Sequence, residues 1–202
     1  WATFIAEWFA FFMGLGICVA LSQNFPKIDW SLIFSKTKVI AILVVNRDIF
    51  LRSFMLEIIF VSFLMTSGKF GDVELAATQI LLQFLHISAY GMDGFAFAAE
   101  VLVGQAVGKS NRSMLRDAVV KSGVWTFTIA VFMAVTYAFL GEVFIAIMTT
   151  SNEVRLVSEN FLIFIVLGPI FGALPFLMDG IFVGATRSVD MRNMMFLSLI
   201  IY

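Results

Sequence analysis

Hydrophobic residues fill this chain in long runs that short polar segments separate. A helix needs about 20 predominantly apolar residues to cross the hydrocarbon core of a bilayer. Runs of that kind predict five membrane spans and the start of a sixth: 1–21, 49–68, 75–107, 117–140, 155–186 and 193–202. The pattern therefore predicts an all-α fold, a polytopic bundle of membrane helices.

The run at 75–107 also carries polar side chains at a regular spacing. Intervals of 4, 3, 4, 3 and 7 residues separate Gln79, Gln83, His86, Tyr90, Asp93 and Glu100. Such intervals place side chains on one face of a helix. Ionisable groups are costly inside a membrane and usually face a bundle interior or a water-filled pathway. We expect this polar stripe to face the bundle interior, either as a hydrogen-bonded seam or as a pathway for a solute or ion.

Two of the predicted spans are too long for a straight crossing. Residues 75–107 and 155–186 would each extend close to 50 Å at about 1.5 Å per residue. Glycines and prolines lie inside both: Gly91, Gly94, Gly168, Pro169, Gly172 and Pro175. A helical proline removes a backbone hydrogen bond and bends the helix. Bends beside polar groups are typical of transporter binding regions, although a bend can also serve packing alone.

The segment 22–48 is the most polar part of the chain. Its apolar run 39–45 is too short to cross a membrane, so we expect a linker that carries a helix lying on the membrane surface. With this linker inside and the loops alternating, eleven of the thirteen Lys and Arg residues lie on the inner side. Only Lys69 and Arg155 lie outside. This strong bias of positive charge supports the predicted topology.

Composition agrees with a membrane location. The chain is 61% hydrophobic and 13% charged, whereas a soluble domain averages roughly 25% charged residues. We therefore expect an integral, multi-pass membrane protein. The basic residues form no cluster of the kind that binds nucleic acid, so we expect no nucleic-acid partner. Cys18 is a single cysteine and His86 a single histidine, so we expect no disulfide, no metal site and no cofactor.

The sequence shows no arrangement of a nucleophile and a general base, so we do not expect an intramembrane enzyme. The chain starts at Trp1 without a methionine and stops inside an apolar run, and we expect it to be part of a longer protein.

A short pattern occurs twice. Met92-Asp93-Gly94-Phe95 and Met178-Asp179-Gly180-Ile181 are each followed four positions later by an alanine, at Ala99 and Ala185. Asp93 precedes the next basic residue by sixteen positions and Asp179 by eight, which predicts different depths and places Asp179 near the inner mouth. The repeated pattern indicates either a parallel structural repeat within the bundle or a chance similarity.

Three blocks of sequence resemble one transporter family. They are NRDIFLR at 46–52, MDGFAFAAEVLVGQAVG at 92–108 and LMDGIFVGATRSVDMRN at 177–193. In order and spacing they are similar to the DinF-type branch of the multidrug and toxic compound extrusion (MATE) transporters. The resemblance implies two lobes of six helices that export organic, often cationic, compounds in exchange for protons or sodium ions. It also implies a bacterial inner (plasma) membrane.

The resemblance divides the chain into three parts. Residues 1–21 would be the last helix of the first lobe, 22–48 the cytoplasmic linker between lobes, and 49–202 part of the second lobe. The expected partners are small organic substrates, the lipid bilayer and the remaining first-lobe helices.

In such an antiporter, intramembrane acids are candidates for the ion and substrate pathway, because burial disfavours a charged carboxylate and promotes proton exchange. Asp93 is the first candidate, since it lies mid-span between glycines on the polar stripe, and Glu100 is the second. The other candidates are Tyr90, His86, Gln83, Glu57 and Asp179.

Two alternatives stay open. A lipid-linked precursor flippase of similar architecture would need several arginines inside the membrane, whereas here we expect arginines at the membrane edges. The chain could also be a fragment without transport activity of its own.

Overall fold

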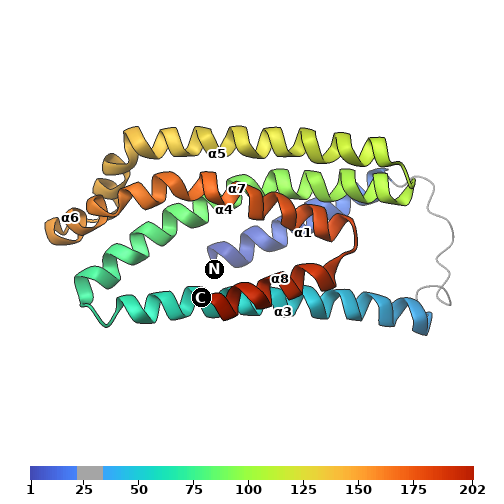
Figure 1. Ribbon diagram of the computed structural model, residues 1–202, viewed down its shortest axis with the longest axis horizontal. Coiled ribbons are helices and arrows are strands. Elements are labelled where there is room, and N and C mark those ends of the chain that lie inside the picture. The colour runs from blue at the N-terminus through green and yellow to red at the C-terminus, as the bar shows by residue number, and fades with distance from the viewer. Residues whose placement is uncertain (22–33) are drawn as a thin grey trace. The chain divides into compact units, whose positions relative to one another are not determined.

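The computed structural model describes residues 1–21 and 34–202, and every regular element in these residues is a helix. The helices are α1 (Ala2–Leu21), α3 (Lys36–Ser67), α4 (Asp72–Gly108), α5 (Arg112–Met148), α6 (Asn152–Asn160), α7 (Leu162–Gly184) and α8 (Ser188–Ile201), as Figure 1 shows. The predicted all-α class is confirmed.

Four helical segments are long and apolar enough to cross a membrane. They are Ala2–Ala20, Val39–Ser67, Arg112–Met148 and Leu162–Gly184. Helix α4 is equally long but is not one of them, because its polar stripe lowers its mean hydropathy. This set identifies an integral, multi-pass membrane protein.

The chain divides into two compact units, Trp1–Leu43 and Val44–Tyr202. In the first unit, α1 exposes its large apolar side chains, and neighbouring rings on it contact one another, as Trp8 and Phe12 do at 5.6 Å between centroids. An apolar surface of this kind suits lipid.

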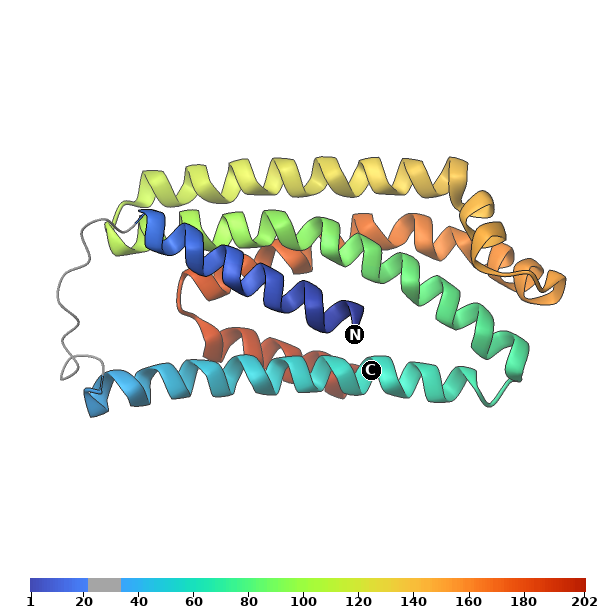
Figure 2. The same cartoon turned by 180° about the vertical axis from the view of Figure 1, so that it is seen from behind.

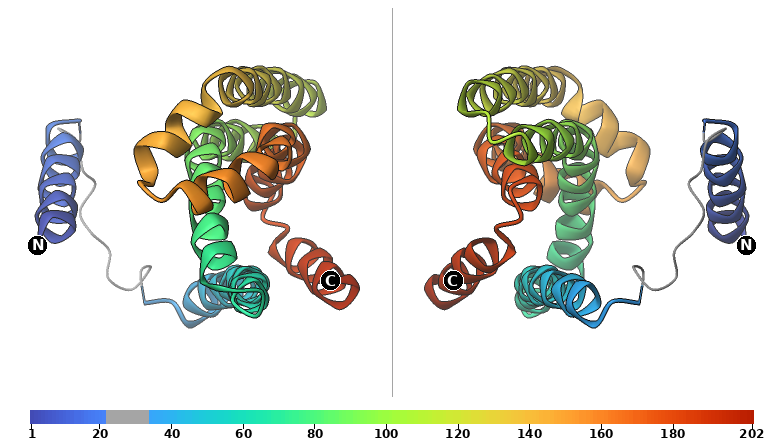
Figure 3. Two further views of the ribbon diagram at one scale, coloured as in Figure 1. Left: turned by 90° about the vertical axis from the view of Figure 1, so that its left-hand side faces the viewer. Right: turned by 90° about the vertical axis from the view of Figure 1, so that its right-hand side faces the viewer.

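The core of the second unit is formed by α4, α5 and α7, which pack on one another along much of their length (Figure 3). Small residues dominate the buried faces. On α4 they include Ala96, Ala99 and Ala106, and on α5 Ala118, Ser122, Thr126, Ala130, Ala134 and Gly141. Small side chains let membrane helices approach closely, so that van der Waals contact replaces the missing hydrophobic effect.

Successive long helices of this unit run in alternating directions, which Figures 1 and 2 show from opposite sides. Helices α4 and α7 consequently run parallel, with α5 antiparallel to both. Both α4 and α7 end in a turn with a left-handed residue, Ser110 (φ 51°) and Thr186 (φ 56°). The two turns lie at the same end of the unit (Figure 1), and the predicted orientation makes it the inner end.

Three helix bounds differ from those expected. The run 39–45 continues into the next span instead of forming a surface helix, because no proline or glycine interrupts Lys36–Ser67. Helix α5 extends to Met148, beyond the expected end of its span at 140. The span expected at 155–186 is broken at Phe161, between α6 and α7, whereas its prolines lie inside α7. Part of the expected linker, 22–33, lies outside the described residues.

Candidate functional site

Two glycines of α7 determine how α7 packs against α4. A Cβ atom on Gly180 would overlap the carbonyl of Ala96, and one on Gly184 would overlap the carbonyl of Glu100. Gly180 and Gly184 are four residues apart, so they lie on one face of α7 and form the small-xxx-small pattern of close membrane helix pairs. The two backbones therefore touch with a fixed register.

This register brings three carboxylates together. Asp179 precedes Gly180, while Asp93 and Glu100 lie on either side of Ala96. Because Gly180 meets Ala96 and Gly184 meets Glu100, Asp179 lies at a level of α4 between Asp93 and Glu100. The two aspartates consequently lie at similar depth, and the expectation that Asp179 sits nearer the inner mouth is wrong. It failed because α4 continues for two turns beyond Glu100, whereas α7 ends at Gly184.

Arg52 of α3 supplies a positive charge to the same cluster. Its Nη2 atom lies 2.7 Å from Oδ1 of Asp179, and the two side chains are only 24% and 28% exposed. The sequence had placed Arg52 at a membrane edge, because the span was expected to begin at 49. Since α3 begins at Lys36, Arg52 lies at its midpoint.

We call Arg52, Asp93, Glu100 and Asp179 the acidic cluster. When all four are ionised, three negative charges face one positive charge. Charges attract strongly where water is scarce, so the excess negative charge creates a site suited to a cation. Among the described residues, no three His, Cys, Asp or Glu side chains converge as the ligands of a metal ion.

The outer part of the polar stripe has a different environment. The buried face of α4 carries Phe84, Ser88 and Met92, which pack toward α5 and α7. Gln79, Gln83, His86 and Tyr90 lie off that face and are exposed, Tyr90 to 74%. The His86 ring lies 6.0 Å from that of Phe60 on α3. Within the described residues this part of the stripe is an open polar face, and Glu57 on α3 is exposed as well.

A second charged network ties α3 to the start of α8. The Asp48 side chain is fully buried and accepts hydrogen bonds from Ser188 Oγ (3.3 Å), Arg192 Nη1 (2.7 Å) and Arg47 Nη2 (3.1 Å). These residues lie in two of the three sequence blocks that carried the family resemblance. Sequence reasoning assigned them no role, because nothing in the sequence showed that 46–52 and 187–192 meet.

Comparison with known proteins places these observations in context. The family described as MatE matches residues 48–202. The DNA damage-inducible protein F of Escherichia coli (strain K12) is 33% identical over 204 residues, which cover 96% of this chain and 42% of that relative. The chain thus spans less than half the length of the relative. No solved structure matches it.

Proposed function

Because this chain belongs to the MatE family, a family of membrane transporters and not of enzymes, we propose that it is part of a secondary active antiporter. The proposed transporter exports organic, often cationic, compounds in exchange for a proton or a sodium ion. The observation that carries the proposal is the acidic cluster, in which α3, α4 and α7 bring an excess of negative charge together inside the membrane.

Exchange follows if the cation and the organic compound compete for this negative charge. A ligand that neutralises the carboxylates weakens the attraction for a second positive ligand, and the effect is reciprocal. In this proposal Arg52 orients Asp179 through their 2.7 Å ion pair, while Asp93 and Glu100 exchange cations. We propose the proton as the coupling ion, because a carboxylate inside a membrane can bind and release one.

The open polar face of α4 would form one side of a substrate pathway, and other helices would have to form the opposite side. Gln79, Gln83, His86 and Tyr90 offer hydrogen-bonding groups that the described residues leave exposed. We propose that first-lobe helices cover this face and that substrate moves between the two. Glu57 is a weaker candidate for the same pathway. The match to a bacterial relative supports a location in the bacterial inner membrane.

A lipid-linked precursor flippase is the alternative within transport. Several arginines inside the membrane would favour it, and the acidic cluster holds one, Arg52. However, Arg52 is paired with Asp179 and surrounded by further carboxylates, so it is a poor site for an anionic headgroup. The exporter therefore agrees better with the charges of the cluster.

An efflux assay tests the proposal. The complete reading frame that contains this chain is reconstituted in liposomes, and export of a cationic dye is followed under a proton gradient and, separately, a sodium gradient. The proposal predicts export that depends on the proton gradient. Export driven by the sodium gradient alone would show that the coupling ion is sodium and not the proton. Absence of export under either gradient would overturn the proposal that the protein is an antiporter.

A further inference from the structure

Helices α3 and α8 run parallel, and side chains join them at two levels. At the inner end, Asp48 of α3 accepts a hydrogen bond from Ser188 of α8 (3.3 Å). Nearer the outer end, Ser62 Oγ of α3 lies 3.1 Å from the hydroxyl oxygen of Tyr202. Both pairs join residues that are 140 positions apart in the chain. The two helices therefore keep one register between these contacts, over about 21 Å at about 1.5 Å per residue.

The end of α7 in turn determines where α8 begins. The turn between them is closed by a backbone hydrogen bond from Arg187 N to the Phe182 carbonyl (2.8 Å), and Thr186 is left-handed (φ 56°). A bond of this span beside a left-handed residue is the Schellman end of a helix. Because Gly180 and Gly184 hold α7 against α4, α8 leaves this turn from a defined position.

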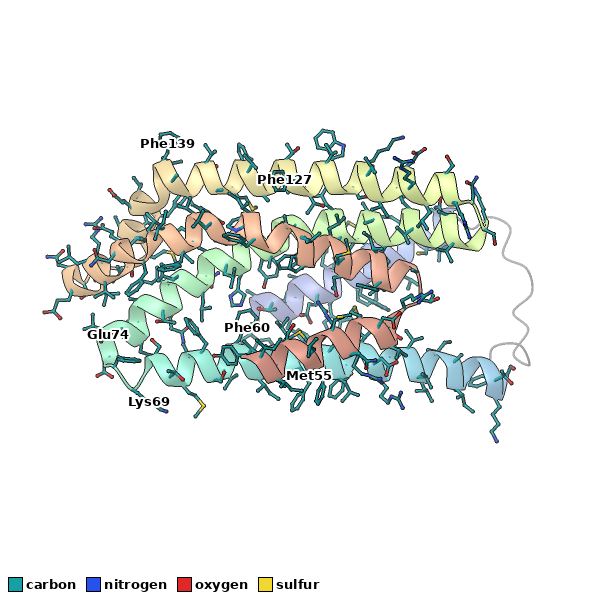
Figure 4. The ribbon with its side chains drawn as sticks, in the orientation of Figure 1. Met55, Phe60, Lys69, Glu74, Phe127 and Phe139 are labelled. Carbon is teal, nitrogen blue, oxygen red and sulfur yellow. The ribbon has the colours of Figure 1, made fainter. Side chains whose placement is uncertain are left out.

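The part of α3 between the two contacts with α8 carries Arg52. Arg52 follows Asp48 by about one helical turn, so the two side chains lie on one face of α3. Met55 and Phe60, which Figure 4 labels, belong to the same part of α3. Helix α3 makes few close backbone contacts with α4, α5 and α7. Between its ends, the height and rotation of α3 beside Asp179 therefore depend on side-chain contacts.

The Asp48 network is the most buried of these contacts. The Asp48 side chain is fully buried and binds Arg192 Nη1 of α8 (2.7 Å) as well as Ser188. A buried carboxylate needs such partners, because an unpaired charge away from water is costly. Sliding α3 along α8 by one helical turn, about 5.4 Å, would break all of these bonds. The network thus holds α3 in a single register against α8.

We infer that Asp48 is a positioning residue, which places Arg52 against Asp179 in the acidic cluster by holding α3 in register with α8. The register passes from the glycines of α7 through the turn to α8, and from α8 to α3. Arg52 then meets Asp179 at 2.7 Å. The inference rests on the proposed function only for its effect on efflux, whereas its structural part depends on these contacts alone.

A double-mutant cycle tests this coupling from α8, so that no neighbour of Arg52 on α3 is changed. In the complete reading frame, Arg52→Gln is made in the wild-type and in the Arg192→Gln background, and melting temperatures are measured in detergent. Breaking the Asp48 network first should already loosen the Arg52–Asp179 pair. We therefore expect Arg52→Gln to lower the melting temperature about half as much or less in the Arg192→Gln background. Equal decreases in the two backgrounds would overturn the inference.

Three further backgrounds make this cycle specific. Ser188→Ala removes one hydrogen bond to Asp48 and provides a milder version of the same test. Arg192→Lys keeps a positive charge beside Asp48 and should restore most of the coupling that Arg192→Gln loses. Arg187→Gln is the matched control, because it changes an exposed arginine at the same end of α8. In that background Arg52→Gln should cost as much as in the wild type.

Efflux separates this inference from the proposed function. If the protein is the proposed antiporter, Arg192→Gln should decrease proton-driven efflux and change its pH dependence in the same direction as Arg52→Gln, whereas Arg187→Gln should do neither. Coupled melting temperatures without any gradient-driven efflux by the wild type would support the positioning role and overturn the proposed function. Independent melting temperatures with normal proton-driven efflux by the wild type would overturn the positioning role alone.

Discussion

Arg52 and Asp179 lie 2.7 Å apart and join α3 to α7 inside the membrane. Helix α3 makes few close backbone contacts with the packed helices α4, α5 and α7. Side-chain bridges therefore hold the part of α3 in the second unit, and this ion pair and the Asp48 network are two of them. A helix held by polar bridges can move when their charges change.

Removing one member of the Arg52–Asp179 pair should destabilise the protein. Arg52→Gln leaves a carboxylate without its partner, at a cost of about 1–3 kcal/mol. The charge-reversed double variant Arg52→Asp/Asp179→Arg should recover much of this loss. Thermal unfolding in detergent measures both.

The control for that experiment is Arg187→Gln, which breaks the exposed pair with Asp190 and should change nothing measurable. If the double variant is no more stable than Arg52→Gln, the pair does not hold α3.

Alanine at Gly180 or Gly184 should push α7 away from α4. The added Cβ overlaps a backbone carbonyl, and overpacking of this kind costs about 1–3 kcal/mol. Gly94→Ala and Gly108→Ala are matched controls, because a Cβ at either position meets nothing within 4 Å. Equal melting temperatures for all four variants would contradict the fixed register.

The Asp48 network should be more sensitive to mutation than exposed ion pairs. Asp48→Asn leaves the guanidinium groups of Arg47 and Arg192 without the buried carboxylate that binds them. We expect a clear decrease in melting temperature and in the yield of folded protein. Asp190→Asn, on an exposed pair of the same region, should behave like the wild type. Indistinguishable yields for the two variants would show that the network is dispensable.

A substitution at Tyr137 tests how much its hydroxyl contributes to the packing of α4 against α5. Its buried hydroxyl donates to the Phe84 carbonyl (3.2 Å) and lies 3.0 Å from Ser88 Oγ. Tyr137→Phe should cost about 0.5–1.5 kcal/mol in stability. Thr136→Val is the control, since that hydroxyl is exposed and bonds only within its own helix. A larger loss in the control would contradict this role of Tyr137.

Much of the fold could be predicted because it depends on local sequence. Long apolar runs predicted the membrane helices, and three motif blocks led to the family, which the comparisons confirm. Membership of a transporter family also confirms that the chain is not an enzyme. The division into a last first-lobe helix, a linker and part of a second lobe stays a prediction.

The acidic cluster was only partly predictable because it depends on contacts between helices. Asp93 and Glu100 were found from their spacing on one helix. The depth of Asp179 could not be found by counting residues, since the register of α7 against α4 is set by Gly180 and Gly184. Arg52 was missed because nothing in the sequence showed that α3 brings it beside Asp179 of α7.

Neutralising the carboxylates one at a time tests the central claim most directly. Asp93→Asn, Glu100→Gln and Asp179→Asn are compared with Asp117→Asn, an exposed acid on α5, in the dye-efflux assay at equal expression. The acidic cluster predicts that each of the three decreases proton-driven efflux about tenfold or more and alters its pH dependence, while the control does neither. Wild-type efflux with unchanged pH dependence in all three would contradict the claim.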